Sequence, residues 1–183
     1  MYYIQIQIED FSSRVAIIRD ILKPLRDAEV ACEIRKGKFE GGKVIAAHSG
    51  NTAGKDYRDL MFPSRARSIR CQYFELWKPK EGSRQLFLEK AYLTIKRRNT
   101  TTHGFDELIA LHCDPNNTDN GLLKKFKQGP HLHVSVLDDP LPKCHFPLNY
   151  SQLDLVLTSP ETLTDALRNA IMIITEEVIV RCA

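Results

Sequence analysis

The sequence predicts an α+β protein built on one mixed, mainly antiparallel sheet of about six or seven strands with two main helices. Segments in which apolar and polar residues alternate indicate half-buried strands. Two longer segments carry apolar residues at helical spacing and indicate helices. No linker-like stretch divides the chain, so we expect residues 1–183 to form a single domain.

The N-terminal part predicts a β-α-β arrangement. Residues 2–8 alternate strictly and indicate a strand, and residues 30–35 indicate a second one. The helix between them should be shortened or kinked by Pro24. Its candidate caps are Asp10, Ser12 and Ser13, and its apolar stripe is Val15, Ile17, Ile18, Ile21, Leu22, Leu25 and Ala28. We expect the two strands to pair in parallel through a right-handed crossover.

Further strands are predicted along the middle of the chain, at 43–48, 67–77, 86–96, 107–112, 131–137 and 152–157. The segments 67–77 and 86–96 should form a hairpin, because a turn-rich stretch separates them. Residues 37–44 approach the spacing of a phosphate-binding loop, but Val44 occupies the position that must bind Mg²⁺ through a hydroxyl. We therefore expect a turn with positive φ there.

The last helix is predicted at about residues 160–180. Thr158 and Ser159 can cap it, Pro160 suits its first position, and Glu161 stands where a capping box places its acidic residue. The predicted buried stripe is Leu163, Ala166, Leu167, Ala170, Ile171, Ile174 and Val178. Met172, Ile173 and Ile179 lie off that stripe, which suggests apolar surface covered by a second chain and a homo-oligomer.

Composition and charge exclude several classes of protein. The net charge of +3 is smaller than a duplex-binding module usually carries. Five widely spaced cysteines without a Cys-x-x-Cys pair favour a reducing, cytoplasmic location over a disulfide framework. Neither a signal peptide nor an apolar run of about 18 residues is present, so we expect no membrane association.

The chemistry-bearing stretch runs from His112 to His145. His131 and His133 lie two residues apart in a predicted strand, so both imidazoles should leave the same face. His112 and Asp114 end the preceding strand, and antiparallel pairing would bring His112 close to the pair. Such a cluster can transfer protons near neutral pH.

Cations accompany these histidines. Lys124, Lys125 and Lys127 lie in the loop before His131, and Arg98 ends the preceding hairpin. They could hold a phosphodiester backbone. In-line cleavage of RNA needs a base for the 2′-hydroxyl, an acid for the leaving oxygen and a cation for the phosphorane. This stretch supplies these residue types, although solvent-exposed histidines and a solvated lysine loop would produce the same pattern.

The C-terminal half also resembles a known family. Asp114 and Asn116 end a strand, Gly129-Pro130-His131-Leu132-His133 opens the next one, and a capped helix follows Pro160. This order is similar to that of TumE-type toxins of bacterial toxin–antitoxin systems, over about residues 85–183. Pro115 splits the Asp/Asn pair, and residues 1–84 have no counterpart. The resemblance implies a small bacterial protein that acts on nucleic acid and is neutralised by an antitoxin-like protein.

The leading hypothesis is a toxin-like bacterial protein that acts on RNA, with His131 and His133 as the acid-base pair and His112 and Asp114 assisting. Lys124, Lys125, Lys127 and Arg98 would bind phosphate. No cofactor is expected. Two alternatives stay open: a non-catalytic interaction subunit of a defence or regulatory assembly, and a metal-dependent hydrolase. Separately, Cys113 and Cys144 could join the histidines in a structural zinc site.

Overall fold

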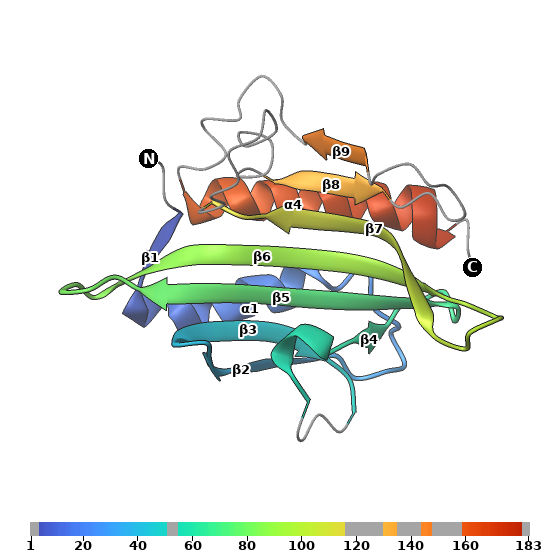
Figure 1. Ribbon diagram of the computed structural model, residues 1–183, viewed down its shortest axis with the longest axis horizontal. Helices are drawn as coiled ribbons and strands as arrows, with labels where there is room; N and C mark the ends of the chain where they lie inside the picture. The colour runs from blue at the N-terminus through green and yellow to red at the C-terminus, as the bar shows by residue number, and fades with distance from the viewer. Residues whose placement is uncertain (1–3, 51–54, 116–129, 135–143, 148–158, 181–183) are drawn as a thin grey trace.

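The computed structural model describes residues 4–50, 55–115, 130–134, 144–147 and 159–180. They form one sheet with two helices against it, which confirms the α+β prediction (Figure 1). Seven strands follow one another in the order β2-β3-β5-β6-β7-β8-β9. Two short strands lie off this path, β1 against β6 and β4 against β5. The strands are β1 Gln5–Gln7, β2 Glu33–Phe39, β3 Gly42–His48, β4 Phe62–Pro63, β5 Ile69–Pro79, β6 Gln85–Arg98, β7 Phe105–Cys113, β8 His131–Val134 and β9 Cys144–Pro147.

The predicted hairpin of the two long strands is confirmed as β5 and β6, which pair antiparallel from Ile69↔Arg97 to Pro79↔Leu86. The prediction of a parallel pair near the N-terminus is wrong. Every strand pair in the described ranges is antiparallel, and β1 pairs with β6 instead of β2. The reason is the length of β6: β7 reaches only as far as Ala91 along it, so the first residues of β6 keep an edge that β1 occupies.

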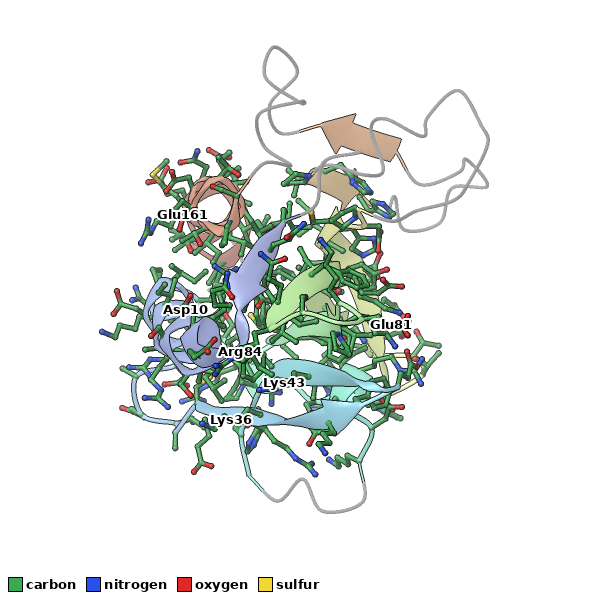
Figure 2. The ribbon with its side chains drawn as sticks, turned by 90° about the vertical axis from the view of Figure 1, so that its left-hand side faces the viewer. Asp10, Lys36, Lys43, Glu81, Arg84 and Glu161 are labelled. Carbon is green, nitrogen blue, oxygen red and sulfur yellow. The ribbon has the colours of Figure 1, made fainter. Side chains whose placement is uncertain are left out.

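Both helices, α1 (Phe11–Ile21) and α4 (Pro160–Ile174), cover the same face of the sheet (Figures 1 and 2). The main apolar core lies between them and that face, and it joins buried residues of α1, α4 and strands from β1 to β8. The other face carries a smaller apolar cluster beside the short turn Tyr57–Asp59. We call this face of the sheet, which lies opposite the face covered by α1 and α4, the helix-free face.

The first helix is shorter than its sequence stripe suggests. It ends at Ile21, before Pro24, as the proline predicts. Ile17, Ala28 and Val30 were expected to face the core, but all three are exposed. Ile17 points away from the sheet, and the other two follow the helix before β2 begins.

The last helix begins as predicted at Pro160, but with a different capping box. Ser159 is the N-cap, and its partner is Thr162 in place of Glu161. From Thr175 to Ile179 the backbone is π-helical. Such a turn holds one more residue than an α-helical turn, so it advances the buried stripe by one position. Ile179, which was expected to be off the stripe, is therefore buried.

The turn between β2 and β3 confirms the rejection of a phosphate-binding loop. Phe39 pairs with Gly42, and the two residues between them, Glu40 and Gly41, have φ values of 47° and 74°. This is the two-residue hairpin turn that favours glycine at a positive φ. A strand follows where a phosphate loop needs a helix.

Candidate functional site

The predicted histidine cluster is formed at the junction of three strands. Tyr92 on β6 pairs with His112 on β7, and His112 pairs with His131 on β8. Directly opposed residues in a sheet point to the same face. The residues adjacent to these in the strands point to the opposite face and belong to the core under the helices: Leu93, Leu111 and Leu132. The histidines therefore occupy the helix-free face.

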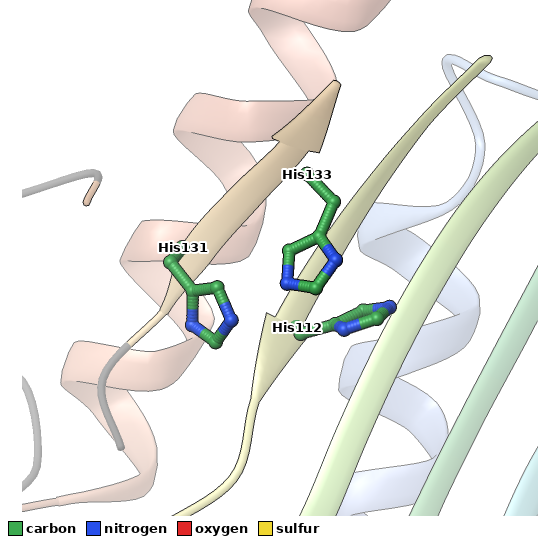
Figure 3. A group of neighbouring side chains, drawn as sticks. All are labelled: His112, His131 and His133. Carbon is green, nitrogen blue, oxygen red and sulfur yellow. The ribbon is translucent and has the colours of Figure 1, made fainter. Parts of the chain in front are cut away.

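The three imidazoles are close together (Figure 3). The ring centroids of His112 and His133 are 4.0 Å apart, those of His131 and His133 are 4.9 Å apart, and those of His112 and His131 are 5.9 Å apart. One ring nitrogen from each residue can be chosen such that all three lie within 4.8 Å of one another. The structure therefore confirms that His131 and His133 share one face of the sheet and that His112 lies close to them.

The strand register explains why His133 reaches His112. His133 is directly opposite Ala110, which carries only a methyl side chain. The small alanine leaves room for the His133 ring to lie across β7 toward His112, which is two residues further along that strand. His131 is 1% exposed, whereas His112 and His133 are half-buried. The cluster thus combines one desolvated ring with two rings that solvent reaches.

Asp114 adjoins the cluster through a tyrosine that the sequence analysis missed. The hydroxyl of Tyr92 donates to a carboxylate oxygen of Asp114 at 2.6 Å, and the Tyr92 ring lies 4.2 Å from the His112 ring. Burial, together with the negative charge of Asp114, raises the pKa of Tyr92 above its ordinary value. Tyr92 can be identified as a neighbour of His112 only when the register of β6 and β7 is known, because the two residues are far apart in the sequence.

The predicted phosphate-binding residues are not gathered at the cluster. Arg98 lies six residues beyond Tyr92 on β6, which corresponds to about 20 Å of extended chain. It is exposed at the far end of β7 from the histidines, opposite Phe105. Lys124, Lys125 and Lys127 fall outside the described residues.

The sequence offered further candidate ligands in Cys113, Cys144 and His145. Cys113 points into the core under the helices, on the opposite face of the sheet, and burial raises the pKa of its thiol. It therefore does not join the histidines in a zinc site. Cys71 is buried, and Cys32 packs against the core. The backbone register places His145 opposite His133 and Cys144 opposite Val134.

A second polar cluster, also missed from the sequence, lies on the helix-covered face. Glu75 accepts hydrogen bonds from Arg14 Nη2 at 2.5 Å, from the Tyr73 hydroxyl at 2.5 Å and from Trp77 Nε1 at 2.8 Å. Arg14 Nη1 donates to Thr164 Oγ1 at 2.5 Å. The signal was a carboxylate at an inward position between Tyr73 and Trp77, because a buried charge requires a partner.

A groove lies beside this ion pair, on the opposite face of the sheet from the histidines. It has a volume of 720 Å³ and runs between β1, α1 and the start of α4, with Asp10 and Glu161 on its rim (Figure 2). Arg14 is in its lining, but Arg14 is already bound to Glu75 and Thr164 and is 3% exposed. Arg14 is therefore not available to an anionic ligand, and Arg168 in the same lining is paired with Asp165.

Chemically, the histidine cluster can do what the second cluster cannot. Imidazoles act as proton donors and acceptors and are the commonest nitrogen ligands of transition metals. The Tyr92–Asp114 pair adds a carboxylate to the surroundings of the cluster. Asp114 accepts a hydrogen bond from Tyr92, and the Tyr92 ring contacts the His112 ring. Of the two clusters, the one on the helix-free face is the candidate active site.

Comparison with known proteins adds no assignment. No protein-family model, no curated protein and no solved structure matches the chain. The resemblance to TumE-type toxins stays a prediction. In the part of the chain that the structure describes, no helix has both the length and the apolar character needed to cross a bilayer.

Proposed function

We propose that the chain is a hydrolase that cleaves RNA in a toxin-like role, with His112, His131 and His133 at its active centre. One observation carries the proposal: three imidazoles from two neighbouring strands converge on one face of the sheet, beside a Tyr–Asp pair. Hydrolysis of a phosphodiester requires that the attacking oxygen lose a proton and the leaving oxygen gain one. Imidazoles serve both needs, either by direct transfer or through a bound water.

The choice of RNA as substrate is supported by cations on the same face. Positions 90, 96 and 98 of β6 share the helix-free face with Tyr92, because the intervening residues Ala91, Leu93 and Ile95 belong to the core on the other side. They are Lys90, Lys96 and Arg98. Lys90 lies two residues to one side of Tyr92, and Lys96 and Arg98 lie four and six residues to the other side. At about 3.3 Å per residue the three cations follow the strand on both sides of the position opposite His112, as an extended polynucleotide would. Arg98 would then bind a phosphate several nucleotides from the cleaved bond.

The test is cleavage of a labelled single-stranded RNA by the untagged protein and by two matched variants. His133→Ala removes a half-buried ring of the cluster, and we expect it to abolish cleavage. His103→Asn changes an exposed histidine at a positive φ of 57°, a conformation that asparagine tolerates, and we expect full activity. Equal cleavage by both variants, or none by the wild-type protein, would contradict the proposal.

A second candidate function is a non-catalytic subunit that binds an antitoxin-like protein or a second copy of itself. The observation in its favour is apolar exposure on the last helical segments: Met172, Ile173 and Val180 are 54%, 44% and 64% exposed. Mass measured by light scattering after size exclusion tests self-association. A dimer that Met172→Ser converts to a monomer would support it, and a monomer at all concentrations would exclude a homo-oligomer.

A further inference from the structure

We infer that His112, His131 and His133 form a binding site for one first-row transition-metal ion, with Zn²⁺ as the best-fitting member of the class. The inference rests on the proposed function only for the role of the ion, which would supply the hydrolytic water. Binding itself follows from the geometry of the cluster and does not depend on which bond the protein cleaves.

The distances fit a metal after a small adjustment. Zn–N bonds of about 2.05 Å in a tetrahedral site place two ligand nitrogens about 3.4 Å apart. In the structure the three nitrogens lie within 4.8 Å of one another. Rotations of the imidazoles about their side-chain torsions can close this difference without moving the strands. His112 and His131 need no backbone shift, because they are directly opposed in the β7–β8 ladder.

The donor set selects the class of ion. Three imidazoles suit Zn²⁺, Co²⁺, Ni²⁺ and Cu²⁺, whereas Mg²⁺ and Ca²⁺ prefer oxygen ligands. Three protein ligands leave the fourth tetrahedral position for water or substrate, which is the pattern of catalytic zinc sites. His131 is buried, and His112 and His133 are half-buried, so the ligand nitrogens lie in surroundings of lower dielectric than water.

The surroundings also favour a shared cation over a purely structural cluster. One nitrogen from each of the three imidazoles converges on a common region, and imidazole nitrogens can donate lone pairs to a single ion. Tyr92 packs against His112 at 4.2 Å and is held in turn by Asp114. Metal-binding histidines commonly have such an outer layer that orients the ring.

A bound ion would define the reaction step. A Zn²⁺ ion held by His112, His131 and His133 would make a bound water lose a proton more easily, and that water oxygen could then attack phosphorus. The new P–O bond forms as the bond to the leaving oxygen breaks, and the released proton ends on that oxygen. One water and one phosphodiester thus give a phosphomonoester and an alcohol, and no oxidant or reductant is required.

The experiment measures metal binding without RNA. The untagged protein is stripped with a chelator, dialysed and titrated with Co²⁺, which reports tetrahedral coordination by a visible absorption band, and then with Zn²⁺ in competition with a chromophoric chelator. We expect one ion per chain in the wild-type protein and in His103→Asn. His112→Ala, His131→Ala and His133→Ala should each weaken binding by more than the about 10–100-fold that loss of an outer-layer partner costs.

The outcomes separate the metal site from the proposed function. Binding that is weak, exceeds one ion per chain, or is unchanged in His133→Ala would overturn the metal site. His133→Gln, which keeps a polar side chain of similar size, and circular dichroism of every variant distinguish ligand loss from unfolding. Tight metal binding without RNA cleavage would leave the site standing and reject the ribonuclease. Cleavage that survives complete removal of metal would retain the ribonuclease and reject the role of the ion in the reaction.

Discussion

The two faces of the sheet hold polar clusters built on opposite principles. On the helix-covered face, Arg14 and Glu75 are opposite charges, and Tyr73, Trp77 and Thr164 complete their hydrogen bonds. On the helix-free face, three groups of the same kind are brought together. The first arrangement neutralises itself inside the protein. The second has no opposite charge of this kind among its three imidazoles, and their nitrogens are suited to bind a cation from solution.

This difference separates stability from activity. A buried ion pair is costly to break because the remaining partner keeps an unpaired charge out of water. A cluster of neutral rings at a half-buried edge can lose a member at a smaller cost. Changes on the helix-covered face should therefore act on folding, and changes on the helix-free face should act mainly on binding and catalysis.

The largest expected effect is on the helix-covered face. Glu75→Gln leaves the Arg14 guanidinium buried without its counter-charge, and we expect it to lower the free energy of unfolding by about 3–5 kcal/mol. Urea unfolding followed by fluorescence of Trp77 measures it. A loss below about 1 kcal/mol, the usual range for surface changes, would show that the pair is not the structural anchor that the comparison requires.

Metal should stabilise the protein through the helix-free face alone. Zn²⁺ at about 100 times its dissociation constant should add about 2.7 kcal/mol to the free energy of unfolding, and a chelator should remove the gain. Thermal unfolding with and without the ion gives the shift. His133→Ala should show none of it, whereas Lys23→Ala, a change at an exposed ion pair, should show all of it. A gain that persists in His133→Ala would place the ion elsewhere.

Tyr92→Phe should cost less and should change the response to alkali. The lost hydrogen bond has a charged acceptor, so we expect about 1.5 kcal/mol, the low end for such bonds, because Tyr92 is half-buried. The raised pKa of Tyr92 means that its stabilisation is complete below the unfolded-state pKa of about 10 and is lost as pH rises beyond it. Unfolding in urea from pH 8 to 11 should therefore show a shallower decline for Tyr92→Phe than for the wild type. Parallel curves would contradict the assignment.

The smallest effect is expected at the exposed pair of Lys23 and Asp20. Its nitrogen–oxygen distance of 2.5 Å equals that of the Arg14–Glu75 pair, but both side chains are more than half exposed. Lys23→Ala should change stability by less than about 1 kcal/mol. Compared with Glu75→Gln in the same urea titration, it isolates burial as the variable. A loss of similar size at both sites would remove burial as the explanation.

The sequence predicted the features that depend on residues near one another in the chain, and it missed those that depend on contacts between distant segments. Local alternation located the long strands and placed His131 and His133 on one face, because a strand alternates sides without reference to its neighbours. The partners of β1 and of Glu75, and the position of Tyr92 beside His112, depend on register between segments distant in the chain, which alternation does not encode. Tyr92 and Arg14 were missed for this reason. The burial of Ile179 was missed because a π-helical turn has no clear sequence signal.

The ion pair of Arg14 also has a consequence for synthesis. Its guanidinium is satisfied by residues 61 and 150 positions further along the chain, one on β5 and one on α4. During translation Glu75 emerges long before Thr164, so Arg14 cannot complete its contacts until the segment that contains Thr164 has left the ribosome. Such distant closures slow folding and make it all-or-none. A truncated chain that ends before α4 should accordingly be a target for proteolysis.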